Sequence, residues 1–169
     1  NEKGKYAGIG IIYEDDSKQI FESLPGNFNS NSRIELYAAI RAIETCENQE
    51  KLIEIRTDSR YVVNSCELWL NIWKKRNWKT FRNEPVRNRD FLKRIDSLIE
   101  KRPGKVYFSY VKGHSTDKNN IIADRLAKKG AAIEMNRNKP LSPYNSFMKF
   151  NLPLIKQNNP NLKHNEAFK

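Results

Sequence analysis

The sequence predicts an α/β domain in which a mixed sheet is covered by helices. Short β-branched runs and amphipathic stretches follow one another as strand, strand, helix, strand, helices, strand, helix, an order typical of layered α/β folds. The 169 residues, of which 38% are hydrophobic and 11% aromatic, suffice for one compact domain with a core. This composition excludes a disordered polymer.

Four segments are expected to form strands. Residues 6–13 are a short apolar, β-branched run, and residues 18–24 alternate in polarity after a polar turn, so the two predict a hairpin. Residues 52–57 alternate in the same way. A Pro-Gly turn precedes the last expected strand, over residues 105–111.

Helices are expected between and after these strands. The first begins at Ser32, which with Glu35 fits a capping box. Residues 59–75 form the next helical stretch, with a break near its middle left open. Amphipathic helices are then expected over residues 88–101 and 119–134.

The chain changes character at Met135. Four prolines and many asparagines replace the periodic pattern from there on, so we expect a domain over residues 1–134 and a tail over residues 135–169. The tail carries six Lys or Arg and one Glu, a net charge of +5, and would wrap around the domain or a partner.

Composition also narrows the location of the protein. With only Cys46 and Cys66, a disulfide scaffold is excluded, and a reducing intracellular compartment is expected, with nucleus, cytoplasm and mitochondrion all left open. No apolar run reaches the roughly 18–20 residues of a membrane span, and no secretory signal opens the chain. The chain starts at Asn1 and not at Met, so we expect a processed or truncated product.

The net charge of +11 and the pI of about 9.7 indicate a polyanionic partner, nucleic acid first and an acidic membrane surface second. Nine basic residues stand against two acidic ones between positions 71 and 94, accompanied by Trp69, Trp73 and Trp78. Basic side chains neutralise phosphates and aromatic rings stack on bases. The alternative is a solvated basic helix in which at least one Trp anchors a long loop to the core.

Three carboxylates stand at positions that suit an active site. Asp58 directly follows the strand over residues 52–57, where crevices of α/β sheets lie. Glu35 lies in the first turn of its helix and Asp124 early in the last helix, after a loop that contains His114. Each has a structural alternative: a capping box for Glu35, an N-cap for Asp58, an ion pair on its own helix for Asp124, and plain surface exposure for His114.

Three motifs nevertheless occur in one order. Residues 31–43 read NSRIELYAAIRAI, residues 55–64 read IRTDSRYVVN, and residues 110–131 read YVKGHSTDKNNIIADRLAKKGA. They resemble the Glu-bearing helix, the strand-end Asp segment and the Gly-His-Ser to Ala-Asp-Arg-Leu-Ala block of the type 1 ribonuclease H family, cellular enzymes that cut RNA in RNA/DNA hybrids. The match covers about Lys5 to Ala132. The Trp-rich basic stretch over residues 69–94, which contains EPVRNRDF, resembles the basic handle of the cellular enzymes.

The resemblance implies an RNase H-like fold with a mixed five-stranded sheet and an Mg²⁺-dependent endonuclease that leaves 5′-phosphate and 3′-hydroxyl ends. Two Mg²⁺ ions, with Mn²⁺ as an alternative, would be held by Glu35, Asp58 and Asp124, because small hard cations prefer clustered carboxylate oxygens. His114 corresponds to the loop histidine that assists proton transfer or product release.

The resemblance also implies a nucleic-acid interface on a free monomer. Asn31 and Asn120 match positions that contact or support the RNA strand, Tyr61 and Trp69 match an aromatic pair along the DNA channel, and Asn88 with Ser30 matches a pocket for a DNA phosphate. The handle adds further candidates: Trp73, Trp78, Lys74, Lys75 and Arg76. A structured RNA or a ribonucleoprotein is a further candidate partner for the tail, and no membrane is expected.

The sequence departs from the family pattern at its start. Its first strand carries a fourth carboxylate, and in this chain that strand would precede Asn1. We therefore expect upstream residues to be absent from this sequence. The alternative is a catalytically inactive relative that binds nucleic acid or serves as a subunit in a ribonucleoprotein assembly.

Overall fold

The computed structural model describes residues 6–14, 18–24, 30–113 and 117–137. The chain divides into two units, Asn1–Met135 and Asn136–Lys169. The predicted tail lies almost entirely outside the described residues, and so does His114.

The described strands form two separate pairs. β1 (Ala7–Ile12) runs antiparallel to β2 (Gln19–Leu24), and β3 (Ile53–Thr57) runs parallel to β4 (Val106–Tyr110). All four strands lie within one or two residues of their predicted bounds, and the mixture of parallel and antiparallel pairing is as expected. The family resemblance implies a five-stranded sheet whose first strand is missing from this sequence. The described residues hold the other strands, and no described strand joins β1 to β3.

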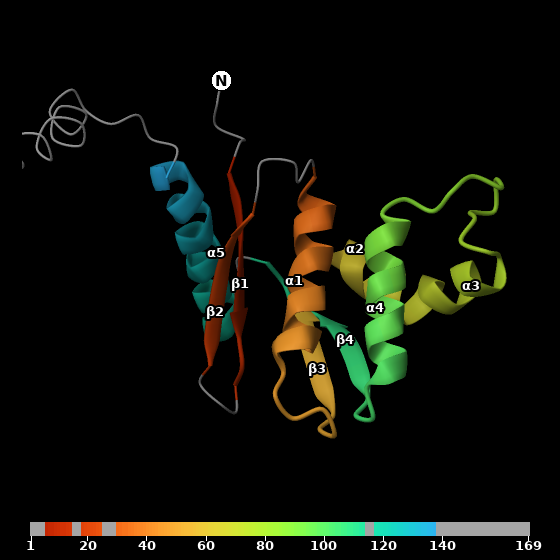
Figure 1. The fold of residues 1–169 in the computed structure, drawn as a ribbon, viewed down its shortest axis with the longest axis horizontal. Coiled ribbons are helices and arrows are strands. Elements are labelled where there is room, and N and C mark those ends of the chain that lie inside the picture. The colour runs from red at the N-terminus through yellow and green to blue at the C-terminus, as the bar shows by residue number, and fades with distance from the viewer. Residues whose placement is uncertain (1–5, 15–17, 25–29, 114–116, 138–169) are drawn as a thin grey trace, which may run out of the picture. The chain divides into compact units, whose positions relative to one another are not determined.

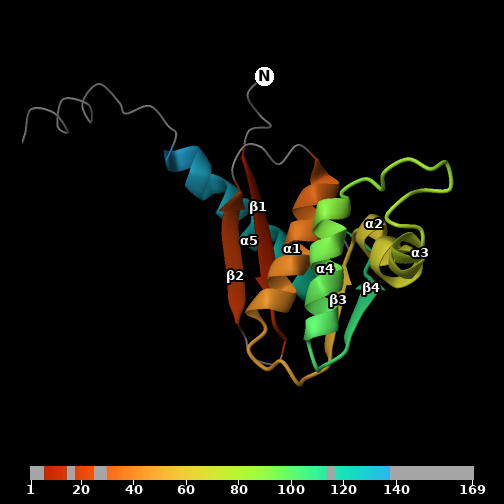
Figure 2. The same cartoon turned by 45° about the vertical axis from the view of Figure 1, so that its right-hand side comes forward.

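The two pairs lie side by side with helices on both faces. α1 (Asn31–Thr45) and α4 (Arg89–Lys101) lie on one side, and α5 (Lys118–Arg137) lies on the other side, against β1 and β2 (Figures 1 and 2). This is the α/β layering that the sequence predicts. β1 and β3 run in opposite directions along this arrangement (Figure 1).

The helical stretch predicted over residues 59–75 is continuous. It consists of α2 (Arg60–Val63), the π-helical segment η1 (Asn64–Trp69) and α3 (Leu70–Lys75). A π-turn adds one residue to the helical repeat without ending the helix, which is why the sequence shows an interrupted period here instead of a break.

The core is divided in the same way as the strands. Ile9, Ile11 and Leu24 of the β1–β2 pair form one buried cluster against α1. The larger cluster joins α1, α2, α4 and β4, and its least exposed members are Leu36, Ile40, Ile43, Val62, Leu92 and Ile95. Helix α1 contributes to both clusters and therefore connects the two halves of the domain.

Candidate active site

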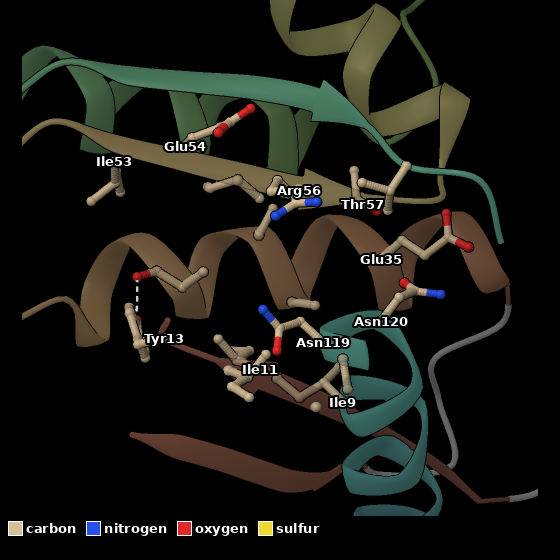
Figure 3. Close-up of a pocket in the computed structure, with 18 of the residues that line it drawn as sticks. Ile9, Ile11, Tyr13, Glu35, Ile53, Glu54, Arg56, Thr57, Asn119 and Asn120 are labelled. Carbon is tan, nitrogen blue, oxygen red and sulfur yellow. Dashed lines mark hydrogen bonds between the residues drawn. The ribbon is translucent and has the colours of Figure 1, made fainter. Parts of the chain in front are cut away.

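A cavity of about 650 Å³ lies between β1 and β3. Both strands line it along their lengths, α1 lines it on one side, and the first turns of α5 line it on the other (Figure 3). Glu35, Asp58, Asp124 and Asn120 all belong to its lining. Three of the predicted catalytic residues therefore reach one cavity from three separate elements.

Glu35 lies in the first turns of α1, at the end of the cavity where Thr57 of β3 and Asn120 of α5 also lie (Figure 3). The predicted capping box is wrong. Helix α1 begins at Asn31, and its N-cap residue is Ser30, whose side chain makes no capping hydrogen bond. Ser32 is consequently already inside the helix, so no capping role for Glu35 remains.

Asp58 follows β3 directly and is exposed. The N-cap of α2 is the next residue, because the Ser59 hydroxyl accepts a hydrogen bond from the Val62 backbone N–H at 3.3 Å. The structural alternative for Asp58 is therefore wrong. The chain after β4 approaches this carboxylate closely, since a Cβ atom on Gly113 would stand 2.8 Å from Asp58 Oδ2.

Asp124 lies in α5 and is half-buried. Within the described part of the chain, no ion pair joins Asp124 to Arg125 or Lys128. The start of α5 is capped by Asp117, whose Oδ1 atom accepts hydrogen bonds from the backbone N–H groups of Asn119 at 2.9 Å and Asn120 at 3.0 Å. The bond from Asn120 N–H holds the pKa of Asp117 below its ordinary value.

The three carboxylates do not yet form a metal site. Their oxygens have the hard donor chemistry that suits Mg²⁺, but no group of three Asp, Glu, His or Cys side chains among the described residues is arranged to hold a metal ion. Glu35, Asp58 and Asp124 thus line one cavity without forming such a group.

Two predicted DNA-side residues contact each other. Asn88 Nδ2 donates to the Tyr61 hydroxyl at 3.2 Å, and that hydroxyl donates to the Arg87 carbonyl at 3.2 Å. Ser30 is the N-cap of α1 and Asn31 is its first residue, so both lie near the same terminus of this helix as Glu35. Tyr61 lies on α2 and Asn88 is the N-cap of α4, so this hydrogen bond joins α2 to the start of α4.

The three Trp side chains differ in exposure and packing. Trp69 is exposed to 37% and packs against Trp73, with ring centroids 5.5 Å apart. Trp73 and Trp78 are half-buried against the larger core cluster, and the Trp78 backbone N–H donates to the Trp73 carbonyl at 2.7 Å. Two of the three Trp residues are thus packed on the core. This is the anchoring role that the sequence offers as the alternative for at least one Trp.

The basic side chains next to them differ in availability. Lys74 Nζ contacts Asp96 at 2.9 Å and Glu100 at 2.7 Å, and these carboxylates raise its pKa. Lys75 and Arg76 are exposed, and Arg76 lies over the Phe81 ring at 4.7 Å. Lys75 and Arg76 are therefore better placed than Lys74 to meet a phosphate.

One residue at this surface was missed by the sequence analysis. Arg33, on α1, contacts Asp90 and Asn88 across a sequence separation of more than fifty residues. The sequence around Arg33 carries no local signal of such a contact, because only the packing of α1 against α4 brings the partners together.

Comparison with known proteins assigns this arrangement to a family. The family model described as RNase H matches residues 1–132. The chain belongs to the RNase H family. As an RNase H it resembles a ribonuclease H of Schizosaccharomyces pombe, with 41% identity over 131 residues, and a ribonuclease H of Alcanivorax borkumensis, with 37% identity over 123 residues. These alignments cover 77% and 73% of this chain.

The relatives are longer than the matched segment. The alignment spans 48% of the S. pombe protein and 78% of the A. borkumensis protein. Among solved structures, a foamy viral protease-reverse transcriptase in complex with dsDNA matches with a TM-score of 0.63 and 25% identity, over 76% of this RNase H chain and 83% of that one. No helix in the described residues is both long enough and apolar enough to cross a membrane.

Proposed function

We propose that this chain is the catalytic domain of an endoribonuclease that hydrolyses the RNA strand of RNA/DNA hybrids. The observation that carries the proposal is the convergence of Glu35, Asp58 and Asp124 on one cavity, from α1, β3 and α5, in a chain of the RNase H family. The corrected capping of α1 and α2 strengthens it, because neither Glu35 nor Asp58 is occupied by a structural role at a helix start.

The proposed cofactor is a pair of Mg²⁺ ions, with Mn²⁺ as a substitute. Bound at such a site, divalent cations supply neutralising charge for the scissile phosphate and lower the pKa of an attacking water. Glu35, Asp58 and Asp124 would hold them through carboxylate oxygens. Asn120, on the same cavity wall, has an amide that can donate to the hydroxyl or phosphate groups of the RNA strand.

The proposal includes one further strand, placed between β1 and β3 and carrying the fourth carboxylate. The cavity supports it, because within the described part of the chain β1 and β3 are each paired with one strand, and both line the cavity. Unpaired backbone groups along two facing edges are unfavourable unless another strand or water satisfies them. Because β1 and β3 run in opposite directions, the inserted strand would be parallel to one and antiparallel to the other.

The proposed partner is the hybrid itself, bound by a free monomer across the surface that carries Tyr61, Trp69 and Asn88. Exposed Lys75 and Arg76 support this placement, because basic side chains beside aromatic rings suit a nucleic-acid backbone. We also propose an intracellular location for the protein.

Hybrid cleavage in Mg²⁺ by the product of the whole gene tests the proposal. Asp58→Asn removes one carboxylate charge at the proposed site, and Glu54→Gln removes one from the same strand, farther along the cavity wall. We expect Asp58→Asn to lose activity and Glu54→Gln to keep it. Equal loss in both variants, or no loss in either, would contradict the assignment.

A second candidate function is a nucleic-acid-binding subunit without catalysis. The exposed Lys75 and Arg76 near the exposed Trp69 favour nucleic-acid binding without requiring catalysis. A stable complex of the whole gene product with RNA, together with no cleavage of any hybrid, would favour this candidate over the enzyme.

A further inference from the structure

We propose that Arg33 is a positioning residue that fixes the side-chain amide of Asn88 so that its N–H group, and not its carbonyl oxygen, faces a phosphate of the bound nucleic acid. This inference rests on the proposed function, because it assigns a role at the same nucleic-acid interface. Its evidence is the set of contacts that surround Arg33 at the junction of α1 and α4.

Arg33 is held in one orientation from two sides. Its NH1 and NH2 atoms donate to the two carboxylate oxygens of Asp90, at 3.0 and 2.7 Å. The guanidinium also lies over the Phe91 ring at 4.1 Å. A two-pronged ion pair combined with ring stacking restrains an Arg side chain far more than a single contact does.

This arrangement makes Arg33 an unsuitable phosphate ligand in its own right. Asp90 takes one donor from each terminal nitrogen and balances the charge of the guanidinium. The partnership also raises the pKa of Arg33, so the group stays charged. The remaining contact of NH1, to Asn88 Oδ1 at 3.5 Å, points to a role exerted through Asn88.

The amide of Asn88 is thereby oriented at both ends. Its carbonyl oxygen faces Arg33 at 3.5 Å, and its Nδ2 atom donates to the Tyr61 hydroxyl at 3.2 Å. An Asn amide nitrogen carries two hydrogens, so a second donor remains available after the bond to Tyr61. A phosphate offers only acceptors, so it can be bound by this donor and would be repelled by the carbonyl oxygen.

The backbone reinforces the orientation. Asn88 has φ = 57°, in the left-handed region, at the N-cap of α4. Its side chain makes no capping hydrogen bond, so the amide is not used by its own helix. Asn is among the few residues that adopt this conformation readily, which ties the position of the amide to this turn. Without Arg33, a rotation of the amide by 180° would present oxygen to the phosphate at little cost.

The experiment measures binding of an RNA/DNA hybrid by fluorescence anisotropy, without cleavage, in an Asp58→Asn background. Each phosphate of the DNA strand is replaced in turn by an uncharged methylphosphonate. We expect one position at which this replacement weakens binding about tenfold in the parent, and at which Asn88→Ala shows no further loss. Arg33→Gln should weaken binding of the unmodified hybrid about tenfold and abolish the sensitivity at that same position.

Arg41→Gln is the matched control. Arg41 also lies on α1, and it forms ion pairs with Glu22 of β2 and Glu44 of α1. We expect Arg41→Gln to leave the phosphate profile unchanged, although it removes the same side chain from the same helix. Melting temperatures of both variants show whether the fold is retained.

The outcomes separate the two proposals. If Arg33→Gln is folded and keeps the position-specific sensitivity, the positioning role is overturned while the proposed function stands. The same holds if Arg33→Gln and Arg41→Gln weaken binding equally and at no particular phosphate. If the parent protein binds no hybrid at all, the proposed function fails and this inference fails with it.

Discussion

Gly10 of β1 lies directly against the backbone of Ala123 in α5. A Cβ atom on Gly10 would stand 2.2 Å from the Ala123 carbonyl oxygen and 2.6 Å from the Ala127 backbone nitrogen. No side chain fits there, so the helix packs on the strand at the distance that only Gly allows. Asp124 follows Ala123 and lines the cavity, so this close approach helps to fix the position of one candidate ligand.

Replacement of Gly10 by Ala should therefore destabilise the protein by about 1–3 kcal/mol, because α5 must shift or the strand must deform to admit a methyl group. Chemical denaturation in urea measures the change as a lower midpoint. Gln19→Ala, at an exposed position of β2, serves as the control and should leave the midpoint almost unchanged. An unaltered midpoint in Gly10→Ala would show that the contact is not tight in solution.

Removal of the Glu35 charge should abolish activity without unfolding the protein. Glu35→Gln keeps the size of the side chain, and no described capping bond depends on the carboxylate. We expect kcat on an RNA/DNA hybrid to fall by about 100-fold or more, as for loss of a metal-holding group. Thermal unfolding provides the comparison, since a large drop in melting temperature would attribute the lost activity to the fold.

The Arg33–Asp90 pair should make stability depend on acid pH. The Arg33 guanidinium holds the pKa of Asp90 below its ordinary value. A carboxyl with a lowered folded-state pKa adds stability above its unfolded pKa, near 4, and loses it as the pH falls through the folded value. Asp90→Asn should thus cost about 1 kcal/mol or less at pH 7, the size expected of an exposed pair.

That cost should shrink toward zero below about pH 4. Urea unfolding of the parent and of Asp90→Asn between pH 2.5 and 7 measures it. A difference that stays constant over this range would show that the pair does not link Asp90 ionisation to folding.

The Cys66 thiol should be inert in the folded protein. Burial, and then the negative charge of Glu67, raises the pKa of Cys66 to about 12. Reaction with a disulfide reagent proceeds through the thiolate, so at pH 8 the folded protein should react about 1,000-fold more slowly than the urea-unfolded chain. A Cys46→Ser variant isolates Cys66 in this measurement. Rates within tenfold of each other would contradict the buried setting of the thiol.

Local pattern was sufficient for the elements of this fold. Alternating polarity located β2 and β3, an apolar β-branched run located β1, and a Pro-Gly turn marked the start of β4, all within one or two residues; α4 and α5 also lie close to their predicted bounds. The start of α1 was placed too late, because Ser32 and Glu35 match a capping box although the helix begins at Asn31 with Ser30 as its N-cap. A side-chain pattern identifies a cap type but does not show where the backbone first turns.

Long-range relationships could not be predicted from the sequence. Arg102 is 6% exposed and donates to the carbonyls of Asn48 at 2.6 Å and Lys51 at 2.7 Å, which ties the end of α4 to the loop before β3. Nothing near Arg102 in the sequence indicates burial of a charged residue. The pairing of β1 with β2 and of β3 with β4 likewise depends on which strand edges meet in space, which local pattern does not report.

The sequence predicted which residues belong to the candidate site but not how they are arranged in space. Motif order identified Glu35, Asp58 and Asp124, and the structure places all three on one cavity. The distances between them depend on how the elements that carry them pack together, and no residue pattern reports those distances.

The most direct test of the proposed function is which strand of which duplex is cut. The whole gene product is incubated in Mg²⁺ with a hybrid labelled on either strand, with an RNA duplex and with a DNA duplex, and the ends are analysed. We expect cleavage only of the RNA strand of the hybrid, with 5′-phosphate and 3′-hydroxyl products that disappear in Asp58→Asn. Cleavage of the DNA strand or of the homoduplexes to a similar extent, or intact RNA in every hybrid, would contradict it.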